Sequence, residues 1–173
     1  TEQLRLPDKL SGVFQLVLTT NASIFPIYEA TQTNNRLVDD RTLTITRPPN
    51  PDLQVFAIAE APAEAQAGGS VSLAFEIVNQ GIVAATGRWQ DKVYISLKNT
   101  LDSSAILLGS FDNLQSLEPG EKYRIETGDL ALSKRLGGPA YLIVQANGNG
   151  AIDESPQGNN NLLVKAIQIL PAP

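Results

Sequence analysis

The sequence contains no cysteine, no histidine and no methionine among its 173 residues. Without cysteine, no disulfide can hold a small β-domain together, so the hydrophobic core must do so alone. Without cysteine and histidine, the chain also lacks thiol nucleophiles, serine–histidine triads, imidazole acid–base groups and the usual zinc ligands. The enzymatic alternatives are therefore reduced to paired carboxylates or a lysine.

The sequence also lacks runs of like charge and long apolar runs. The 13 Lys and Arg residues and the 18 Asp and Glu residues are scattered along the chain, and the net charge is −5. No basic stripe is present, so we expect no nucleic-acid partner. No run approaches the roughly 20 apolar residues that cross a bilayer, so we expect no membrane insertion. Because the chain does not begin with Met, we expect a fragment of a longer polypeptide, with any signal peptide outside it.

Aromatic residues are few, at 6%, whereas Thr, Val, Ile and Leu alternate with polar residues over long stretches. This composition and the period of two predict an all-β protein without helices. Short strands separated by turn residues favour an immunoglobulin-like antiparallel β-sandwich of about seven strands. The expected strands lie near residues 53–58, 71–77, 88–97, 106–111, 123–125, 140–146 and 162–170. The first should kink or bulge as it passes between sheets, because its apolar residues change parity. The second should lie mid-sheet.

A long internal repeat organises the chain. LPDKLSG at residues 6–12 is matched by LSKRLGG at 132–138, and EATQTNN at 29–35 is matched by ESPQGNN at 154–160. The offset is 126 residues for the first pair and 125 for the second. A repeat of this length is a whole domain. We therefore expect residues 1–46 to be the C-terminal part of a preceding repeat, 47–51 (RPPNP) to be a Pro-rich linker, and 52–171 to be a complete module.

The first segment is expected to form three strands, at residues 2–6, 12–19 and 41–46, which make half a sandwich. Phe14, Leu16 and Leu18 would share one face and lack a covering layer. An unpaired β-edge above an apolar face invites association. The short, stiff linker disfavours folding back onto the complete module, so the sequence favours a homodimer through residues 1–46.

Several motifs follow one another along the second part of the chain: PDLQV, then RWQDKVYIS followed by NTLDSSAILLGSF, then LEPGEKY and finally LGGPAYLIVQANGNGAIDESPQGNNN. Together they resemble the CARDB family, the cell-adhesion-related domain found in bacteria. Their order and spacing cover residues 51 to about 170, and residues 6–45 are similar to the last third of another copy. The resemblance implies an immunoglobulin-like sandwich that occurs in tandem in large secreted or surface-attached proteins, with neighbouring repeats as partners.

On this basis we expect a non-enzymatic module of a secreted or cell-surface bacterial adhesin-type protein. It would act as a spacer and display unit with adhesion-related binding, outside the cell or on its surface. The alternative is a carbohydrate-binding accessory module of a secreted hydrolase, which would bind its ligand through outward aromatic residues.

The aromatic residues of the predicted strand 88–97 have opposite parities. Trp89 shares its face with Val93, Ile95 and Leu97, so it is interpreted as a core anchor rather than a sugar-stacking platform. Asp91 falls in the same row, so either a bulge turns it outward or it is a partly buried carboxylate with hydrogen-bond donors around it.

Tyr94 and Tyr141 would instead face outward from neighbouring strands. They are the candidate ligand-binding residues, although cross-strand packing explains their placement equally well.

Oxygen-rich loops supply the remaining candidates. The loop from Asn147 to Glu154 is a calcium alternative, although it lacks the spacing of an EF-hand. The preferred interpretation is that Glu154, Asn159 and Asn160 brace the loop's own backbone, as Glu29, Asn34 and Asn35 would in the preceding repeat. No cofactor is expected.

The loop 98–105 is interpreted as a polar turn braced by its own Ser and Asn side chains, and two pairs of adjacent acids are interpreted as solvated charge. CARDB sequences that this chain resembles often carry Asp where it has Lys98 and Ala105, so any calcium affinity of the loop 98–105 would be lost here. The pairs Asp39–Asp40 and Asp153–Glu154 are adjacent in sequence, which generally points their carboxylates apart, unlike the facing carboxylates of a glycosidase.

Overall fold

The computed structural model describes residues 3–7, 10–154 and 160–172. The chain divides into two compact units, Thr1–Pro48 (unit 1) and Pro49–Pro173 (unit 2). The division falls among the prolines of residues 47–51, whose rings remove backbone donors and keep the chain extended. Throughout the described ranges every element is a strand, and no helix is long and apolar enough to cross a membrane.

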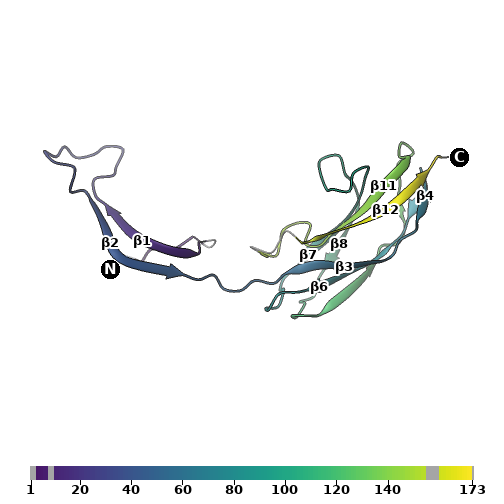
Figure 1. Cartoon of the computed structure of the whole chain (residues 1–173), viewed down its shortest axis with the longest axis horizontal. Helices are drawn as coiled ribbons and strands as arrows, with labels where there is room; N and C mark the ends of the chain where they lie inside the picture. The colour runs from purple at the N-terminus through teal and green to yellow at the C-terminus, as the bar shows by residue number, and fades with distance from the viewer. Residues whose placement is uncertain (1–2, 8–9, 155–159, 173) are drawn as a thin grey trace. The chain divides into compact units, whose positions relative to one another are not determined.

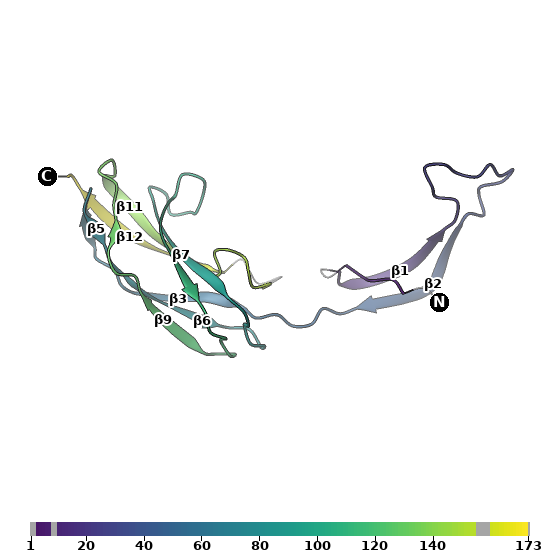
Figure 2. The same ribbon diagram turned by 180° about the vertical axis from the view of Figure 1, so that it is seen from behind.

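Unit 2 is a β-sandwich, which confirms the predicted immunoglobulin-like fold. One sheet has five strands in the order β4 (Glu64–Gln66), β12 (Leu162–Leu170), β11 (Gly138–Gln145), β7 (Trp89–Ser96) and β8 (Ile106–Asn113). The other has three, β3 (Leu53–Glu60), β6 (Ala74–Asn79) and β9 (Lys122–Glu126). A small pair, β5 (Ser70–Val71) and β10 (Leu130–Ala131), completes the module. The two main sheets lie in separate layers (Figures 1 and 2).

The chain changes sheets between β3 and β4. β3 pairs antiparallel with β6, and its register shifts between Val55 and Ala57 and again between Ile58 and Glu60. After Pro62, β4 pairs parallel with β12 in the opposite sheet. Bulges bend a strand and increase its twist, which redirects the chain toward the second layer. The predicted irregularity of this strand is therefore confirmed.

The core lies between the two sheets and follows the period of two. Alternate residues of β7 and β11 point inward, and β6, the middle strand of its sheet as predicted, supplies the facing side chains. The largest fully buried side chains include Trp89, Phe75, Leu53, Ile77, Ile95 and Leu142. Leu97 was expected in the same row as Trp89 but is 63% exposed, because β7 ends at Ser96 and the chain turns into a loop.

Short elements account for the other differences from the expected seven strands. The predicted strand 71–77 is interrupted, so that β5 and β6 are separate, and β4 and β10 are additional two- or three-residue strands. The turn at Pro119 and Gly120 has the expected type II features: Gly120 has a φ of 79°, and Glu121 N donates to Glu118 O at 3.0 Å. This turn leads into β9.

Unit 1 is an antiparallel hairpin of β1 (Gly12–Thr19) and β2 (Arg36–Ile45). The sequence predicted three strands, but described residues 3–6 form none, and β2 begins five residues earlier than residue 41. Leu16 and Leu18 are 55% and 61% exposed, because two strands make no second layer to cover them.

Candidate functional site

A polar cluster centres on Asp91, which lies in the core row of β7 with no exposed surface. Tyr123 Oη donates a hydrogen bond to one carboxylate oxygen, and Asn147 N donates to the other at 3.0 Å. Trp89 Nε1 donates in turn to Tyr123 Oη at 3.0 Å. Of the two possibilities that the sequence left open, the structure has the buried carboxylate surrounded by donors.

The environment of Asp91 favours its protonated form. Burial raises the pKa of Asp91 to about 6, and the nearby Glu154 also raises it, whereas the hydrogen bonds from Tyr123 and Asn147 lower it. Burial, followed by the charge of Asp91, raises the pKa of Tyr123, so its hydroxyl remains a donor. Because the Asp91 carboxyl has no exposed surface, it can form hydrogen bonds within the fold but cannot contact a ligand from solvent.

Asn147 organises the loop that follows β11. Its backbone is left-handed, with a φ of 49°, a conformation that Asn tolerates better than most residues. Its side chain closes a ring with Ile152, because Nδ2 donates to Ile152 O at 2.8 Å and Oδ1 accepts from Ile152 N at 3.2 Å. Nδ2 also lies 2.5 Å from Glu154 Oε1. The loop is thus shaped by its own side chains.

Glu154 ties this loop to the start of the module. It is buried, and its Oε2 accepts from Leu53 N at 2.6 Å, across 101 residues of sequence. Its Oε1 accepts from Asn161 Nδ2 at 2.7 Å. Burial raises the pKa of Glu154, although its three donors oppose that change. The carboxylate therefore joins β3 to the loop between β11 and β12.

The bracing partners differ from the sequence-based prediction. Asn161, which was not predicted, bonds Glu154, whereas Asn160 Nδ2 donates to Asp52 Oδ2 at 3.2 Å. Neighbouring residues point to different sides, so only one of the two asparagines reaches the carboxylate. The third predicted residue, Asn159, lies outside the described residues. Glu154 also bonds the first strand of unit 2, β3, and not only the backbone of its own loop.

Sequence reasoning missed Asn79, which is fully buried at the end of β6. Its Oδ1 accepts from Asp52 N at 3.1 Å and Gly81 N at 3.0 Å, and its Nδ2 donates to Val83 O and Leu117 O at 2.8 and 2.9 Å. All of its hydrogen-bonding capacity is used within the fold. The available signal was an Asn that closes an alternating apolar strand immediately before Gln and Gly.

Tyr94 and Tyr141 lie on the outer face of the five-stranded sheet. Tyr94 is directly opposite Ile143 in the register of β7 and β11, and Tyr141 is two residues away, opposite Ser96. The two rings are therefore diagonal neighbours on one face. Both are half-buried, Ile143 between them is fully buried, and Tyr94 Oη lies 3.3 Å from Gln145 Oε1. Burial raises the pKa of Tyr94.

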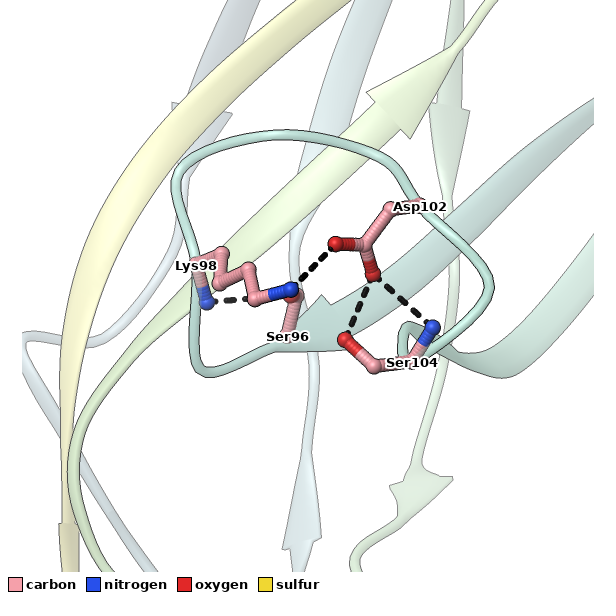
Figure 3. A network of polar contacts seen from close by, with 4 residues as sticks. All are labelled: Ser96, Lys98, Asp102 and Ser104. Carbon is pink, nitrogen blue, oxygen red and sulfur yellow. Dashed lines mark hydrogen bonds and ion pairs between the residues drawn. The ribbon is translucent and has the colours of Figure 1, made fainter.

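The loop between β7 and β8 is braced by one carboxylate (Figure 3). Asp102 accepts from Lys98 Nζ at 2.6 Å, from Ser104 N at 2.8 Å and from Ser104 Oγ at 2.5 Å. Ser96 Oγ accepts from Lys98 N at 3.0 Å. The Lys98 ammonium, and then Ser104, hold the pKa of Asp102 well below its usual range. The Asp102 carboxylate is thus already paired with the Lys98 ammonium.

The two adjacent acid pairs do not form facing carboxylates. Glu154 is buried whereas Asp153 is exposed. Asp39 is held by Arg41, whose Nη2 lies 2.9 Å from Asp39 Oδ2, and this pairing lowers the pKa of Asp39. Among the described residues, no group of three or more acidic side chains is arranged to hold a metal ion.

The loop of unit 1 repeats several hydrogen bonds of the loop after β11, although its ring of Asn and Ile spans one more residue. Asn21 has a φ of 53°, its Nδ2 donates to Ile27 O at 2.7 Å, and its Oδ1 accepts from Ile27 N at 2.6 Å. Asn35 Nδ2 donates to Glu29 Oε2 at 2.7 Å, as Asn161 does to Glu154. Each loop closes with the same backbone bond, Thr20 N to Asn35 O in one and Ala146 N to Asn161 O in the other, both at 2.9 Å.

A family comparison matches this architecture. The model of the CARDB family matches residues 50–164, which is more than half of the chain and nearly all of unit 2. The chain belongs to the CARDB family. CARDB is a family of broadly adhesion-related, extracellular-type modules without catalytic activity.

A solved structure shows the same fold. A CARDB domain from Pyrococcus furiosus, crystallised in complex with di-metal ions, is 18% identical with a TM-score of 0.52. The match covers 73% of this chain and 99% of that domain. A β-glucosidase from Listeria innocua is 15% identical with a TM-score of 0.45, and the match covers 71% of this chain but 17% of the enzyme. No curated protein matches the chain.

Proposed function

We propose that this chain is a spacer and display segment of a secreted or cell-surface adhesin-type protein built from successive CARDB modules. Unit 2 is one complete module, and residues 6–45 are the last two strands and connecting loop of the module before it. The segment separates and orients binding surfaces along the parent polypeptide, and adhesion contacts are made by modules of this kind rather than by a catalytic centre.

The main support for this proposal is that the loop organised by Asn147 in unit 2 recurs in unit 1, where Asn21 takes the same place. The rings that Asn21 and Asn147 close around an isoleucine occur 126 residues apart, with the same left-handed backbone at each Asn. The flanking strands correspond beside the loop, where Val17 pairs with Val38 as Ile143 pairs with Val164. Farther from the loop the register of β1 and β2 shifts, between Gln15 and Val17, whereas that of β11 and β12 does not. A loop of this detail, repeated after about 126 residues with one residue of difference inside it, indicates one module followed by another.

The use of the polar side chains supports a structural role. Asp91, Glu154 and Asn79 are buried, and each has hydrogen-bond partners from at least two different segments of unit 2. Such groups are costly to bury and are retained where they fix one arrangement of the chain. A repeating spacer requires this fixed arrangement, and it does not require a reactive cleft.

Surface labelling of intact cells tests the proposal. Antibodies raised against this chain should label intact cells of the source organism or detect the parent polypeptide in the medium. Mild protease treatment of the cells should remove the label, while a cytoplasmic marker stays protected. Detection only after lysis would contradict the proposal. Glycoside-hydrolase activity in the captured polypeptide would instead favour an accessory module of a hydrolase.

A further inference from the structure

The outer edge of β1 has no neighbouring strand among the described residues. In the described part of unit 1, β1 pairs with β2 alone, whereas β11, its counterpart, lies between β12 and β7. β7 pairs antiparallel with residues 141–145, which correspond to residues 15–19 of β1. A strand edge without a neighbour presents main-chain donors and acceptors that another strand can pair with.

The apolar face beside this edge matches a buried face of unit 2. Leu16 and Leu18 correspond to Leu142 and Val144, which have no exposed surface in the core of unit 2. In unit 1 both leucines are more than half exposed. The same positions that are covered by the opposite sheet in one module are thus uncovered in the other, which indicates a covering layer of the same kind.

Two polar groups mark where that layer attaches. Asn147 N donates to Asp91 of β7, and Glu154 accepts from Leu53 N at the start of β3. Their counterparts are Asn21 N and Glu29, and among the described residues Glu29 accepts only from Asn35. The loop of unit 1 therefore has the geometry to donate to an aspartate of one strand and to accept a main-chain N–H of another.

We propose that the edge and apolar face of unit 1 bind the first two thirds of a CARDB sandwich, contributed by the upstream part of the same polypeptide. A strand of the β7 type adds antiparallel to β1, and its aspartate accepts a hydrogen bond from Asn21 N. The first strand of that part donates a main-chain N–H to Glu29. This inference rests on the proposed tandem arrangement and adds the groups that make the contact.

A second copy of unit 1 fits these groups less well. It would cover Leu16 and Leu18 with another hairpin, as the sequence-based homodimer through residues 1–46 supposes. Its Asp39, however, already accepts three hydrogen bonds from Arg41 of its own strand. The aspartate that Asn21 requires is thus supplied more readily by a strand of the β7 type.

The repeat itself supplies the probe for a test. Thr1, Leu4 and Leu6 correspond to Thr127, Leu130 and Leu132, so residues 50–126 placed directly before Thr1 of the full chain complete unit 1 in register. Amide hydrogen exchange of residues 15–19 is measured in the extended and the original chain. We expect exchange in the extended chain to slow by a factor on the order of 100 or more, and the extended chain to sediment as a monomer.

Matched variants make the result specific. In the extended chain, Asp91→Ala in the added segment, or Glu29→Ala, should restore part of the fast exchange. In the original chain Glu29→Ala removes only the hydrogen bond from Asn35 and should change the exchange of residues 15–19 much less. Phe14 corresponds to the buried Ala140, so a Phe14→Ala version removes the risk of overpacking. Fast exchange in both extended chains, or a dimer that leaves the added segment unfolded, would overturn the proposal. Surface labelling of cells depends on neither result, so the two proposals can fail separately.

Discussion

The hairpins β1–β2 and β11–β12 have similar loops and opposite surroundings. Both turn through an Asn in the left-handed region, and both close their loops with the same backbone and side-chain hydrogen bonds. Yet Leu142 has no exposed surface, whereas Leu16 at the equivalent position is 55% exposed. Local geometry here is determined by the loop sequence, and burial is determined by the strands that pack across the sheet.

The difference has an energetic consequence. Covering a leucine side chain stabilises a fold by about 1.5–3 kcal/mol, and an isolated two-stranded hairpin is marginally stable at best in water. Unit 2 obtains this stabilisation from its own second sheet. Unit 1 has the pattern of side chains for it but, among the described residues, not the covering layer. Substitutions at matched positions should therefore have unequal effects.

The largest effect is expected at Trp89, the only tryptophan of the chain. Trp89→Ala should lower the free energy of unfolding of unit 2 by roughly 3 to 5 kcal/mol, because it removes a 1% exposed core side chain and leaves a cavity. Urea unfolding followed by circular dichroism measures the loss, with Trp89→Phe as the milder control. In the unsubstituted protein, fluorescence that is fully accessible to a quencher would contradict a core position.

A matched pair of leucines tests the comparison directly. Leu142→Ala should destabilise unit 2 by about 2–5 kcal/mol, whereas Leu16→Ala should change the stability of unit 1 by less than about 0.5 kcal/mol. Trp89 fluorescence during urea unfolding measures unit 2 in the first variant, and amide hydrogen exchange of β1 measures unit 1 in the second. In the extended chain described above, Leu16→Ala should become costly, measured as faster hydrogen exchange of β1. Equal losses for the two substitutions in the original chain would refute the difference in burial.

Alternation of apolar residues was enough to predict the sandwich and most of its core. Trp89, Val93 and Ile95 follow the strict period of two, so their common face could be inferred from spacing alone. Leu97 has the right parity, but its exposure depends on where β7 ends, and strand ends are set by pairing with neighbouring strands. Parity therefore predicted the faces of strands better than their limits.

The polar braces were harder to predict, because their partners are distant in sequence. Glu154 was identified as a bracing residue, but its bond to Leu53 N spans 101 residues and has no local signal. Asn79 bonds Leu117 O across 38 residues and was missed altogether. The choice of Asn161 over Asn160 depends on which side chain points toward the carboxylate. Such contacts follow from tertiary topology, which a single sequence constrains weakly.

The buried acid of unit 2 predicts an unusual pH dependence. The pKa of Asp91 is raised from 3.8 to about 6 in the folded protein, so between these values the folded state binds more protons than the unfolded state. The free energy of unfolding should therefore fall as the pH rises from 4 to 7, by at most about 3 kcal/mol from this group. Glu154, whose pKa is also raised, contributes with the same sign.

Urea unfolding of the unsubstituted protein and Asp91→Asn between pH 4 and 7.5 measures this contribution. Asn can still accept from Asn147 N and can donate to Tyr123 Oη, so the variant should fold while losing part of the pH dependence. The difference between the two profiles isolates Asp91 from the partly exposed carboxylates Asp39 and Asp102, whose lowered pKa values act in the opposite direction. Parallel profiles would show that Asp91 does not titrate in this range.

The smallest expected effect is that of calcium, for which we predict no change in thermal unfolding with EDTA or with millimolar Ca²⁺. Calcium takes six to eight oxygen ligands, several of them carboxylates. In unit 2 the Glu154 carboxylate already accepts three hydrogen bonds, and the Asp102 carboxylate is paired with the Lys98 ammonium.

A ligand present at 100 times its dissociation constant stabilises the native state by about 2.7 kcal/mol, which would raise the midpoint of thermal unfolding by several degrees. A calorimetric scan would detect such a rise, and it would contradict the prediction. Asp153→Asn and Glu154→Gln would then identify the ligands, with Asp39→Asn in unit 1 as the control.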